Sequence, residues 1–259
     1  MTYTIQVGNG GYVGWKVLER TMARQREAFS RDTSTTADRN YFIEHMPNVR
    51  GADDLIRDYR LMTVTLRAFG LDADINNKFF IKKVLESNPD DRSSLVNRLS
   101  DKRYLKLNQA LSLNHSEVHN ATRVQTILAQ YEERSFEKNI GERYPEIELT
   151  LNAQRELPQI ASLEISENAK WYQILGSKPL RQIFEKAYGL GSNFSSLPID
   201  RQLMEIKSKA KINSGNESVG QFQAAETRES LLRRYLLRNH ISVSSESSRF
   251  TTALTILRS

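Results

Sequence analysis

The sequence predicts an all-α protein, a multi-helix bundle with two weakly similar helical halves, on three observations. Apolar residues recur at helical spacing along most of the chain, and glycine or proline stands where these patterns stop. Alternating residues typical of a strand occur only within the first seven positions. With 39% hydrophobic residues in a length of 259, the chain can form a sizeable core.

The N-terminal segment "TYTIQVGNGGYVGW" raises the question of a nucleotide-binding loop. Gly8 and Gly10 fit the first two glycines of the G-x-G-x-x-G fingerprint, but the third place falls on Val13. The polar stretch "RDTSTTADRN" stands downstream, where the fingerprint requires a second buried strand. We therefore expect an arm whose glycines mark the entry to a helix.

Residues 1–37 are predicted to form this N-terminal arm and one helix. Trp15, Leu18, Met22 and Phe29 fall near one helical stripe, which must be buried against another surface. We regard these four residues as candidate contacts for a partner protein or for the C-terminal segment. The polar residues 31–40 are expected to form a linker.

Residues 38–113 are predicted to form the first helical half. Asp38 is expected to cap a short helix that ends at Met46, and one helix is expected from the acidic pair Asp53 and Asp54 to Gly70. A further helix is expected over 75–85, and another begins after "NPDD". The predicted inner positions of these helices are Leu55, Tyr59, Met62, Leu66, Phe69, Ile75, Phe79, Leu85, Leu95, Leu99 and Leu107.

Residues 114–241 are predicted to form the second helical half. A long helical stretch breaks at Gly141 and restarts with Pro145 in the first turn. Ser166 is expected to cap the next helix, and Gly176 to end it. A last helix places Leu231, Leu232, Tyr235 and Leu236 inward.

The two halves contain a weak internal repeat. "LRAFGLD" at 66–72 resembles "EKAYGLG" at 185–191, and each closes a helix. The distance to the next similar helix differs between the halves, so duplication is a hypothesis that superposition of the halves would test.

Residues 242–259 are predicted to form a Ser-rich linker and a short apolar helix. Phe250, Leu254 and Leu257 form the apolar face of that helix, and they are the other candidate partner contacts. Such a terminal helix either docks on its own domain or inserts into a groove of a partner.

Composition excludes several classes of function. The chain has no cysteine, which excludes disulfides, thiol catalysis and cysteine-ligated zinc. No apolar run approaches the roughly 18 residues of a membrane span, and no signal peptide is evident, so we expect a cytoplasmic or flagellum-associated protein. The formal charge of +6 is spread among acids, so we expect a solvated helical surface and no nucleic-acid partner.

Candidate catalytic and metal-binding groups each have a simpler explanation. His115 and His119 have the i,i+4 spacing of a zinc pair, but Glu117 stands between them, unlike the glutamate of the zincin motif. The acidic pairs 53–54 and 90–91 stand where helices begin and negative charge is favoured. We therefore expect a protein that is not an enzyme, with no metal, no cofactor and no small-molecule ligand.

Several segments taken in order resemble the DUF1217 family of uncharacterised bacterial proteins. They include "LIRDYRLMTVTLRAFGLDADINNKFFIKKVLES", "SLVNRLSDKRYLKL", "FEKNIGERYPEIELTLNAQREL" and "WYQILGSKPLRQIFEKAYGL". The family occurs mainly in alpha-proteobacteria, and its genes often lie among flagellar genes. The resemblance therefore implies a helical protein associated with the flagellum, and it supplies no catalytic or cofactor residue.

Together, these observations favour a non-enzymatic structural or assembly protein that contacts a flagellar component. The alternative is a basic helical module that binds nucleic acid or regulates flagellar genes. A face of arginine and lysine free of acids would favour that alternative, as would binding that weakens steeply with salt.

Overall fold

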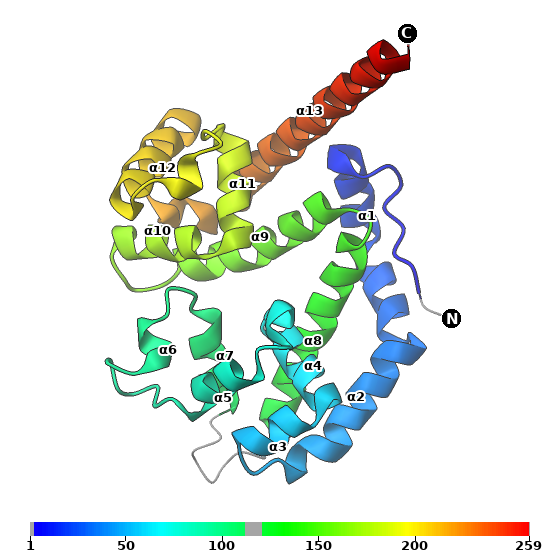
Figure 1. Ribbon diagram of the computed structural model, residues 1–259, viewed down its shortest axis with the longest axis vertical. Coiled ribbons are helices and arrows are strands. Elements are labelled where there is room, and N and C mark those ends of the chain that lie inside the picture. The colour runs from blue at the N-terminus through cyan, green and yellow to red at the C-terminus, as the bar shows by residue number, and fades with distance from the viewer. Residues whose placement is uncertain (1–2, 112–120, 259) are drawn as a thin grey trace. The chain divides into compact units, whose positions relative to one another are not determined.

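The computed structural model describes residues 3–111 and 121–258, with side chains described for 3–111 and 122–241. Within these residues the chain is helical and contains no strand, so the predicted all-α class is confirmed. Figure 1 labels the helices in chain order. In the described part of the chain, no helix has both the length and the apolar content that crossing a bilayer requires.

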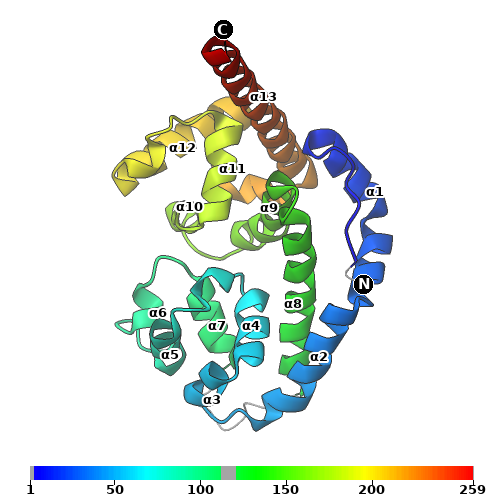
Figure 2. The ribbon, with the colours of Figure 1, turned by 45° about the vertical axis from the view of Figure 1, so that its right-hand side comes forward.

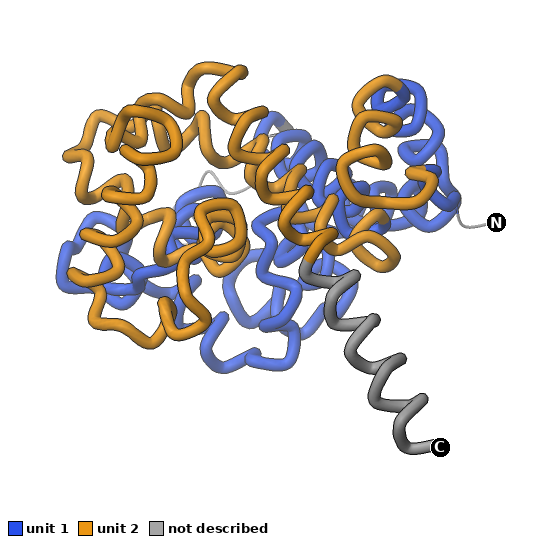
Figure 3. The backbone as a smooth tube through the Cα atoms, turned by 90° about the horizontal axis from the view of Figure 1, so that it is seen from above, with its two compact units in different colours: residues 1–6, 21–139 blue, residues 7–20, 140–259 orange. Residues whose placement is uncertain are grey.

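The chain divides into two compact units, which Figure 3 shows in different colours. Unit 1 comprises residues 1–6 and 21–139, and unit 2 comprises residues 7–20 and 140–259. The predicted boundary between the halves at 113/114 differs from this division at 139/140. The reason is that Val124, Ile127 and Leu128 pack into the core of unit 1, which assigns most of the helix that follows residue 114 to that unit.

Unit 1 is built from short helices and most of one long helix (Figure 1). Its elements are α1 (Gly11–Ser30) from residue 21, α2 (Thr33–His45), η1 (Met46–Asn48), α3 (Ala52–Arg57), α4 (Tyr59–Ala68), η2 (Asp72–Asp74), α5 (Lys78–Glu86), α6 (Leu95–Arg98), α7 (Arg103–Leu111) and α8 (Ala121–Gly141) as far as residue 139. Its core joins Phe42, Met62, Val84, Leu107 and Leu128, which come from five of these helices.

Unit 2 is built around α11, which packs against α9, α10, α12 and α13 (Figure 2). Its elements are the first half of α1, the end of α8, α9 (Pro145–Ala161), α10 (Glu167–Gly176), α11 (Lys178–Tyr188), η3 (Phe194–Ser196), α12 (Ile199–Ser214), η4 (Val219–Gln223) and α13 (Ala225–Arg258). Trp171, Phe184 and Phe222 meet edge to face in its core, with Phe184 5.5 Å from Trp171 and 5.4 Å from Phe222 between ring centroids.

The glycines of the N-terminal arm have distinct structural roles. Gly8, Gly10 and Gly11 adopt positive φ, and α1 begins at Gly11, as the sequence predicts for an entry to a helix. The N–H of Gly11 donates to Oε1 of Glu146 at 3.0 Å, so a carboxylate of the same unit occupies this helix N-terminus. A Cβ at Gly14 would lie 2.9 Å from the backbone oxygen of Val7, so this glycine permits close packing of the arm.

The linker predicted over 31–40 is wrong, because α2 occupies most of it. Asp32 is the N-cap of α2 and accepts from the N–H of Ser34 at 3.0 Å. Asp38, the predicted cap, lies inside the helix, where its carboxylate binds Arg60 at 2.8 Å. The polar composition suggested a linker because most of these residues lie on the exposed side of a helix.

The single helix predicted to end at Gly70 is also wrong in one respect. Asp58 has extended backbone and separates α3 from α4, and its carboxylate accepts from the N–H groups of Arg60 and Leu61. Tyr59 is therefore the first residue of a new helix and is exposed, whereas Leu55 and Met62 are buried as predicted.

Two predicted inner positions of the next helices are likewise exposed. In α5 the buried residues are Ile81, Val84 and Leu85, and this spacing leaves Phe79 on the opposite side, 75% exposed. The helix expected after "NPDD" forms as α6 and α7, and Val96 is buried in place of its neighbour Leu95.

Helix ends in the second half are predicted more accurately. The break at Gly141, the restart at Pro145, the cap by Ser166 and the end at Gly176 are all confirmed. The predicted linker after residue 241 lies within the bounds of α13.

Candidate functional site

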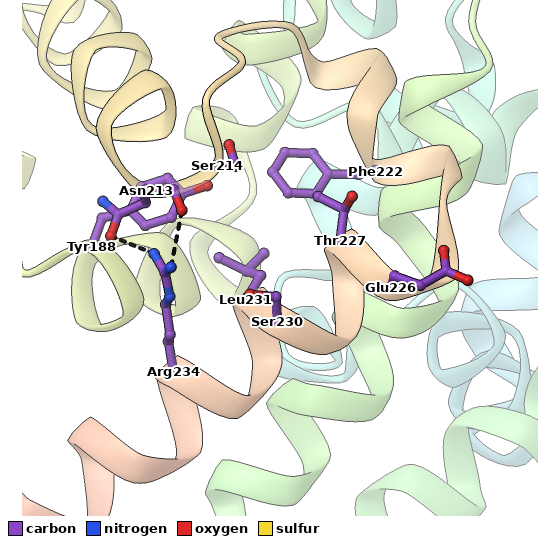
Figure 4. Close-up of a pocket in the computed structure, with 9 residues that line it drawn as sticks. All are labelled: Tyr188, Asn213, Ser214, Phe222, Glu226, Thr227, Ser230, Leu231 and Arg234. Atoms are coloured by element: carbon purple, nitrogen blue, oxygen red, sulfur yellow. Dashed lines mark hydrogen bonds between the residues drawn. The ribbon is translucent and has the colours of Figure 1, made fainter.

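A recess of unit 2 lies where α12 ends and α13 begins (Figure 4). It is a cavity of about 250 Å³, which we call the unit 2 cavity. Its lining comes from the ends of α11 and α12, from η4 and from the first three turns of α13. The lining residues are Tyr188, Asn213, Ser214, Phe222, Glu226, Thr227, Ser230, Leu231 and Arg234.

The end of α12 shapes one side of this cavity. Gly215 adopts φ of +76° and ends the helix in the left-handed conformation that glycine tolerates. The hydroxyl of Ser214 donates to the carbonyl of Ala210 at 2.8 Å, which fixes the side chain against its own helix. The N–H of Gly215 closes the helix by donating to the carbonyl of Lys211 at 2.8 Å, and the carbonyl groups of the last turn have no donor further along the helix.

Arg234 of α13 binds the backbone carbonyl of Asn213 at this helix end. Its Nη2 donates to the backbone oxygen of Asn213 at 2.9 Å, and its Nη1 donates to the side-chain oxygen of the same residue. Figure 4 shows the guanidinium reaching from α13 to Asn213. A cation at a helix C-terminus is favoured by the helix dipole, so Arg234 joins the two helices and brings a positive charge to the cavity.

The floor of the unit 2 cavity is apolar. Phe222 and Leu231 are buried, and Tyr188 is buried apart from the part of its side chain that lines the recess. Burial raises the pKa of Tyr188, although Arg234 and Ser214 act in the opposite direction. The phenol therefore stays protonated across the physiological range and serves as a hydrogen-bonding group.

The remaining polar groups come from one face of α13. Thr227, Ser230 and Arg234 stand at i, i+3 and i+7, which places two hydroxyls and a guanidinium on the same side of the helix. Glu226 completes the lining and is exposed. This arrangement can hold a small polar group by hydrogen bonds. The tyrosine stays protonated, so it cannot act as a general base near neutral pH.

The candidate partner contacts of the first helix lie elsewhere and are largely internal. Trp15, Leu18 and Phe29 are buried, and Met22 is half-buried. These side chains fill the cores of their own units and do not form an exposed surface. Phe250, Leu254 and Leu257 belong to the stretch whose side chains lie outside the described residues.

The acidic pairs that the sequence places at helix starts have local structural roles. Asp53 and Asp54 are in the first turn of α3, where Asp53 also binds Lys82 at 2.6 Å. Asp91 instead stabilises a turn by accepting from the N–H of Ser93 at 2.8 Å. His115 and His119 lie outside the described residues, and within those residues no three or more histidine, aspartate or glutamate side chains come together as metal ligands.

The unit 2 cavity was not predicted from the sequence. Its lining comes from segments near residues 188, 214 and 230, and only folding brings these together. One local signal existed in the sequence "INSG". Its glycine is typical of a helix C-terminus, and a basic side chain often binds the last carbonyl groups there.

Comparisons with known proteins bear on the family and the fold. The family model described as "Protein of unknown function (DUF1217)" matches residues 68–223. A crystal structure of an Agrobacterium tumefaciens protein, a structural genomics target, has a TM-score of 0.72 and 21% sequence identity, covering 93% of this chain and 99% of that chain. At this identity the likeness shows the fold alone. No curated protein matches the sequence.

Proposed function

Because the chain belongs to the DUF1217 family of proteins of unknown function, we propose that it is a non-enzymatic protein that acts by contact with another protein in the assembly of the bacterial flagellum. The flagellar context comes from the gene neighbourhoods that the family resemblance implies. The structural support is a pair of exposed apolar side chains on helix α12 of unit 2.

One observation carries the contact role. Met204 and Ile212 of α12 are 65% and 74% exposed, although α12 buries Leu203, Ile206 and Ala210 on its other side. These two side chains stand eight positions apart on the same face of the helix, and we take them as the contact that a partner covers. The terminal residues Phe250, Leu254 and Leu257 remain a predicted second contact.

The nucleic-acid alternative receives less support from the described residues. The basic pair Lys82 and Lys83 lies near carboxylates, since Lys82 binds Asp53 at 2.6 Å and Lys83 lies 3.9 Å from Glu86. Arg234 is directed to Asn213. These basic pairs therefore do not form the acid-free face that phosphate binding favours.

Deletion of the gene in its own host tests the proposed function. We expect lost or reduced swimming, restored by the gene on a plasmid, with hooks or basal bodies arrested at one stage under the electron microscope. Normal swimming and intact basal bodies would contradict the flagellar role. Binding to DNA or RNA that weakens steeply with salt would then favour the alternative.

A further inference from the structure

The N-terminal arm runs back along the helix that it precedes. Residues 3–6 belong to unit 1 and have no helix or strand structure. Tyr3 bonds to Asp32, at the far end of α1, and Gln6 bonds to Gln25, further back in α1. The arm therefore lies antiparallel to α1, as Figure 1 shows.

Buried side chains of unit 1 bind the main chain of this arm. The N–H of Tyr3 donates to Oδ1 of Asp32 at 2.8 Å, and the N–H of Gln6 donates to Oε1 of Gln25 at 2.6 Å. Nε2 of Gln25 donates to the carbonyl oxygen of Gln6 at 2.8 Å, so one amide binds both peptide groups of the same residue. Gln25 and Asp32 are 4% and 6% exposed, and polar groups buried to this degree need hydrogen-bonding partners.

The arm also places alternate side chains inward. Ile5 is buried between two exposed neighbours, and its N–H donates to Oδ1 of Asn139 at 3.4 Å. Val7, in unit 2, is buried as well and lies close to Gly14. Proteins bind extended peptides in this way, through the main chain and every second side chain. The residues of unit 1 that bind the arm, which we call the arm-binding surface, are Gln25, Asp32 and Asn139.

A short glycine hinge joins the arm to α1. Gly8, Gly10 and Gly11 all adopt positive φ, and Asn9 is the one other residue of this stretch. The hydroxyl of Tyr144 donates to the carbonyl oxygen of Gly8, and this bond is exposed, so water can replace it. Glycine loses more conformational freedom than any other residue when it is fixed, and short hinges favour the exchange of a segment between copies.

We infer that the arm-binding surface also takes up the arm of a second copy of the chain, so that two copies exchange residues 3–7 reciprocally. A second copy fits because its arm offers the same peptide groups and the same isoleucine and valine. The contacts of the arm are then equal in the closed chain and in the exchanged dimer, and the two forms differ at the hinge. The inference goes beyond the proposed function and does not depend on the flagellum.

Crosslinking between two different chains tests the exchange. The chain has no cysteine, so each introduced thiol is unique. One full-length chain carries Thr4→Cys on the exposed side of the arm, and a second, tagged chain carries Ala28→Cys, which lies in α1 between Gln25 and Asp32. The chains are unfolded together in urea, refolded together at high concentration and treated with a short bismaleimide.

Two further samples serve as controls. A chain with both cysteines shows that the reagent joins positions 4 and 28. Thr4→Cys mixed with Lys83→Cys, an exposed position of α5, measures crosslinking by random collision. We expect an adduct of twice the 29.8 kDa chain mass from the mixture of Thr4→Cys with Ala28→Cys, well above the level with Lys83→Cys. No adduct above that level would overturn the inference.

The hinge supplies a second, independent measurement. Gly8 has φ of +76°, and no atom of the described residues lies within 4 Å of the position of a Cβ, so Gly8→Ala penalises the closed turn through its backbone alone. An opened hinge lets this alanine leave positive φ. Each dimer has two hinges, so we expect the dissociation constant of the dimer to fall by about tenfold or more in sedimentation experiments.

Gly215→Ala is the matched control for the hinge. Gly215 has the same φ of +76° and the same open space, but it ends α12. Its substitution should change the dissociation constant by less than about twofold. Circular dichroism checks that both variants are folded. Equal dissociation constants for Gly8→Ala and Gly215→Ala, or weaker association of Gly8→Ala, would contradict arm exchange.

Discussion

The two units end one helix in the same way. In unit 1, α4 leads through Phe69 into Gly70, and in unit 2, α11 ends at Tyr188 and Gly189. The glycines have φ of +68° and +63°. The N–H of each following leucine donates to the carbonyl group five residues earlier, at 2.8 and 2.9 Å. The repeated motif "A-F/Y-G-L" thus specifies one helix end twice.

The same two glycines also contact similar side chains. A Cβ at Gly70 would lie 2.6 Å from Nη1 of Arg134 in α8, and one at Gly189 would lie 2.5 Å from Nη1 of Arg238 in α13. Each arginine belongs to the last helix of its unit. This local correspondence supports the hypothesis of a repeat, and superposition of whole units remains its test.

The units differ in how a side chain caps the C-terminus of the next helix, which is α5 in unit 1 and α12 in unit 2. In unit 1 the buried Asn108 donates to the carbonyl groups of Val84 and Ser87 at the end of α5, at 2.7 and 2.8 Å. In unit 2 the half-buried Arg234 performs this role for α12, and the cavity opens beside it. The difference shows that the cavity of unit 2 lies beside the more exposed of the two capping side chains.

The largest expected effect concerns the aromatic core of unit 2. Trp171 is 0% exposed, and its Nε1 donates to the backbone oxygen of Glu217 at 2.9 Å. Trp171→Ala leaves a large cavity, so we expect the free energy of unfolding to fall by about 3–5 kcal/mol. Urea denaturation followed by far-UV circular dichroism measures this. Trp171→Phe keeps an aromatic ring and should lose less, and an equal loss in both variants would contradict the packing account.

The second prediction compares the two capping side chains. Asn108→Ala leaves buried carbonyl groups without a donor, so we expect a loss of about 2–3 kcal/mol. Arg234→Ala should cost about 1 kcal/mol or less, because water can reach the carbonyl of Asn213 beside the cavity. Urea midpoints of the two variants give the comparison, and a larger loss for Arg234→Ala would reverse our ranking.

The third prediction concerns the repeated glycines. Gly70→Ala and Gly189→Ala force alanine into positive φ and crowd an arginine, so each should cost about 1–2 kcal/mol. Gly215 has φ of +76°, and no atom of the described residues lies within 4 Å of the position that a Cβ would take. Gly215→Ala therefore measures the cost of positive φ alone. Gly51→Ala, with extended backbone and open space, is the neutral control. Different losses at Gly70 and Gly189 would argue against equivalent helix ends.

The smallest expected effect depends on pH. Burial raises the pKa of Asp58, but hydrogen bonds from the Leu61 N–H and the Tyr41 hydroxyl outweigh it, and the pKa lies below its ordinary value of 3.8. The ionised carboxylate therefore stabilises unit 1 above pH 3.8, and this contribution is lost as pH falls through the lowered pKa. Asp58→Asn should cost about 1 kcal/mol at pH 7.

The cost of Asp58→Asn should shrink below pH 3.8, because the wild-type carboxyl is then becoming protonated. Ser177→Ala at the start of α11 is the matched control, since the Ser177 side chain makes no capping hydrogen bond. We expect Ser177→Ala to change the stability little at either pH. Thermal unfolding at pH 7 and pH 3 measures the stability of both variants. A pH-independent cost for Asp58→Asn would show that the charge of the Asp58 carboxylate does not contribute to stability.

Local signals predicted much of the fold. Glycine and proline mark helix ends by their backbone geometry alone, which explains the success at Gly141, Pro145 and Gly176. Asp58 was read as part of a helix, because an aspartate inside a helix and one at an N-cap look alike in a single sequence.

The unit 2 cavity and the exposed apolar side chains of α12 could not be predicted, for a different reason. Met204 and Ile212 are apolar residues at helical spacing, and the sequence alone does not say which stripe of α12 faces the core. The unit 2 cavity is lined by Arg234 and Asn213, which are in contact although they stand 21 positions apart in the chain. Both features arise from packing between helices, which periodicity does not describe.

Complementation of the gene deletion tests most directly the central claim, which is a contact role through Met204 and Ile212 of α12. The deletion strain receives either the natural gene or the gene with Met204→Glu and Ile212→Glu, and swimming is scored at matched protein levels. Our account predicts that the natural gene restores swimming and the variant, although folded, does not. Full restoration of swimming by the variant would contradict it.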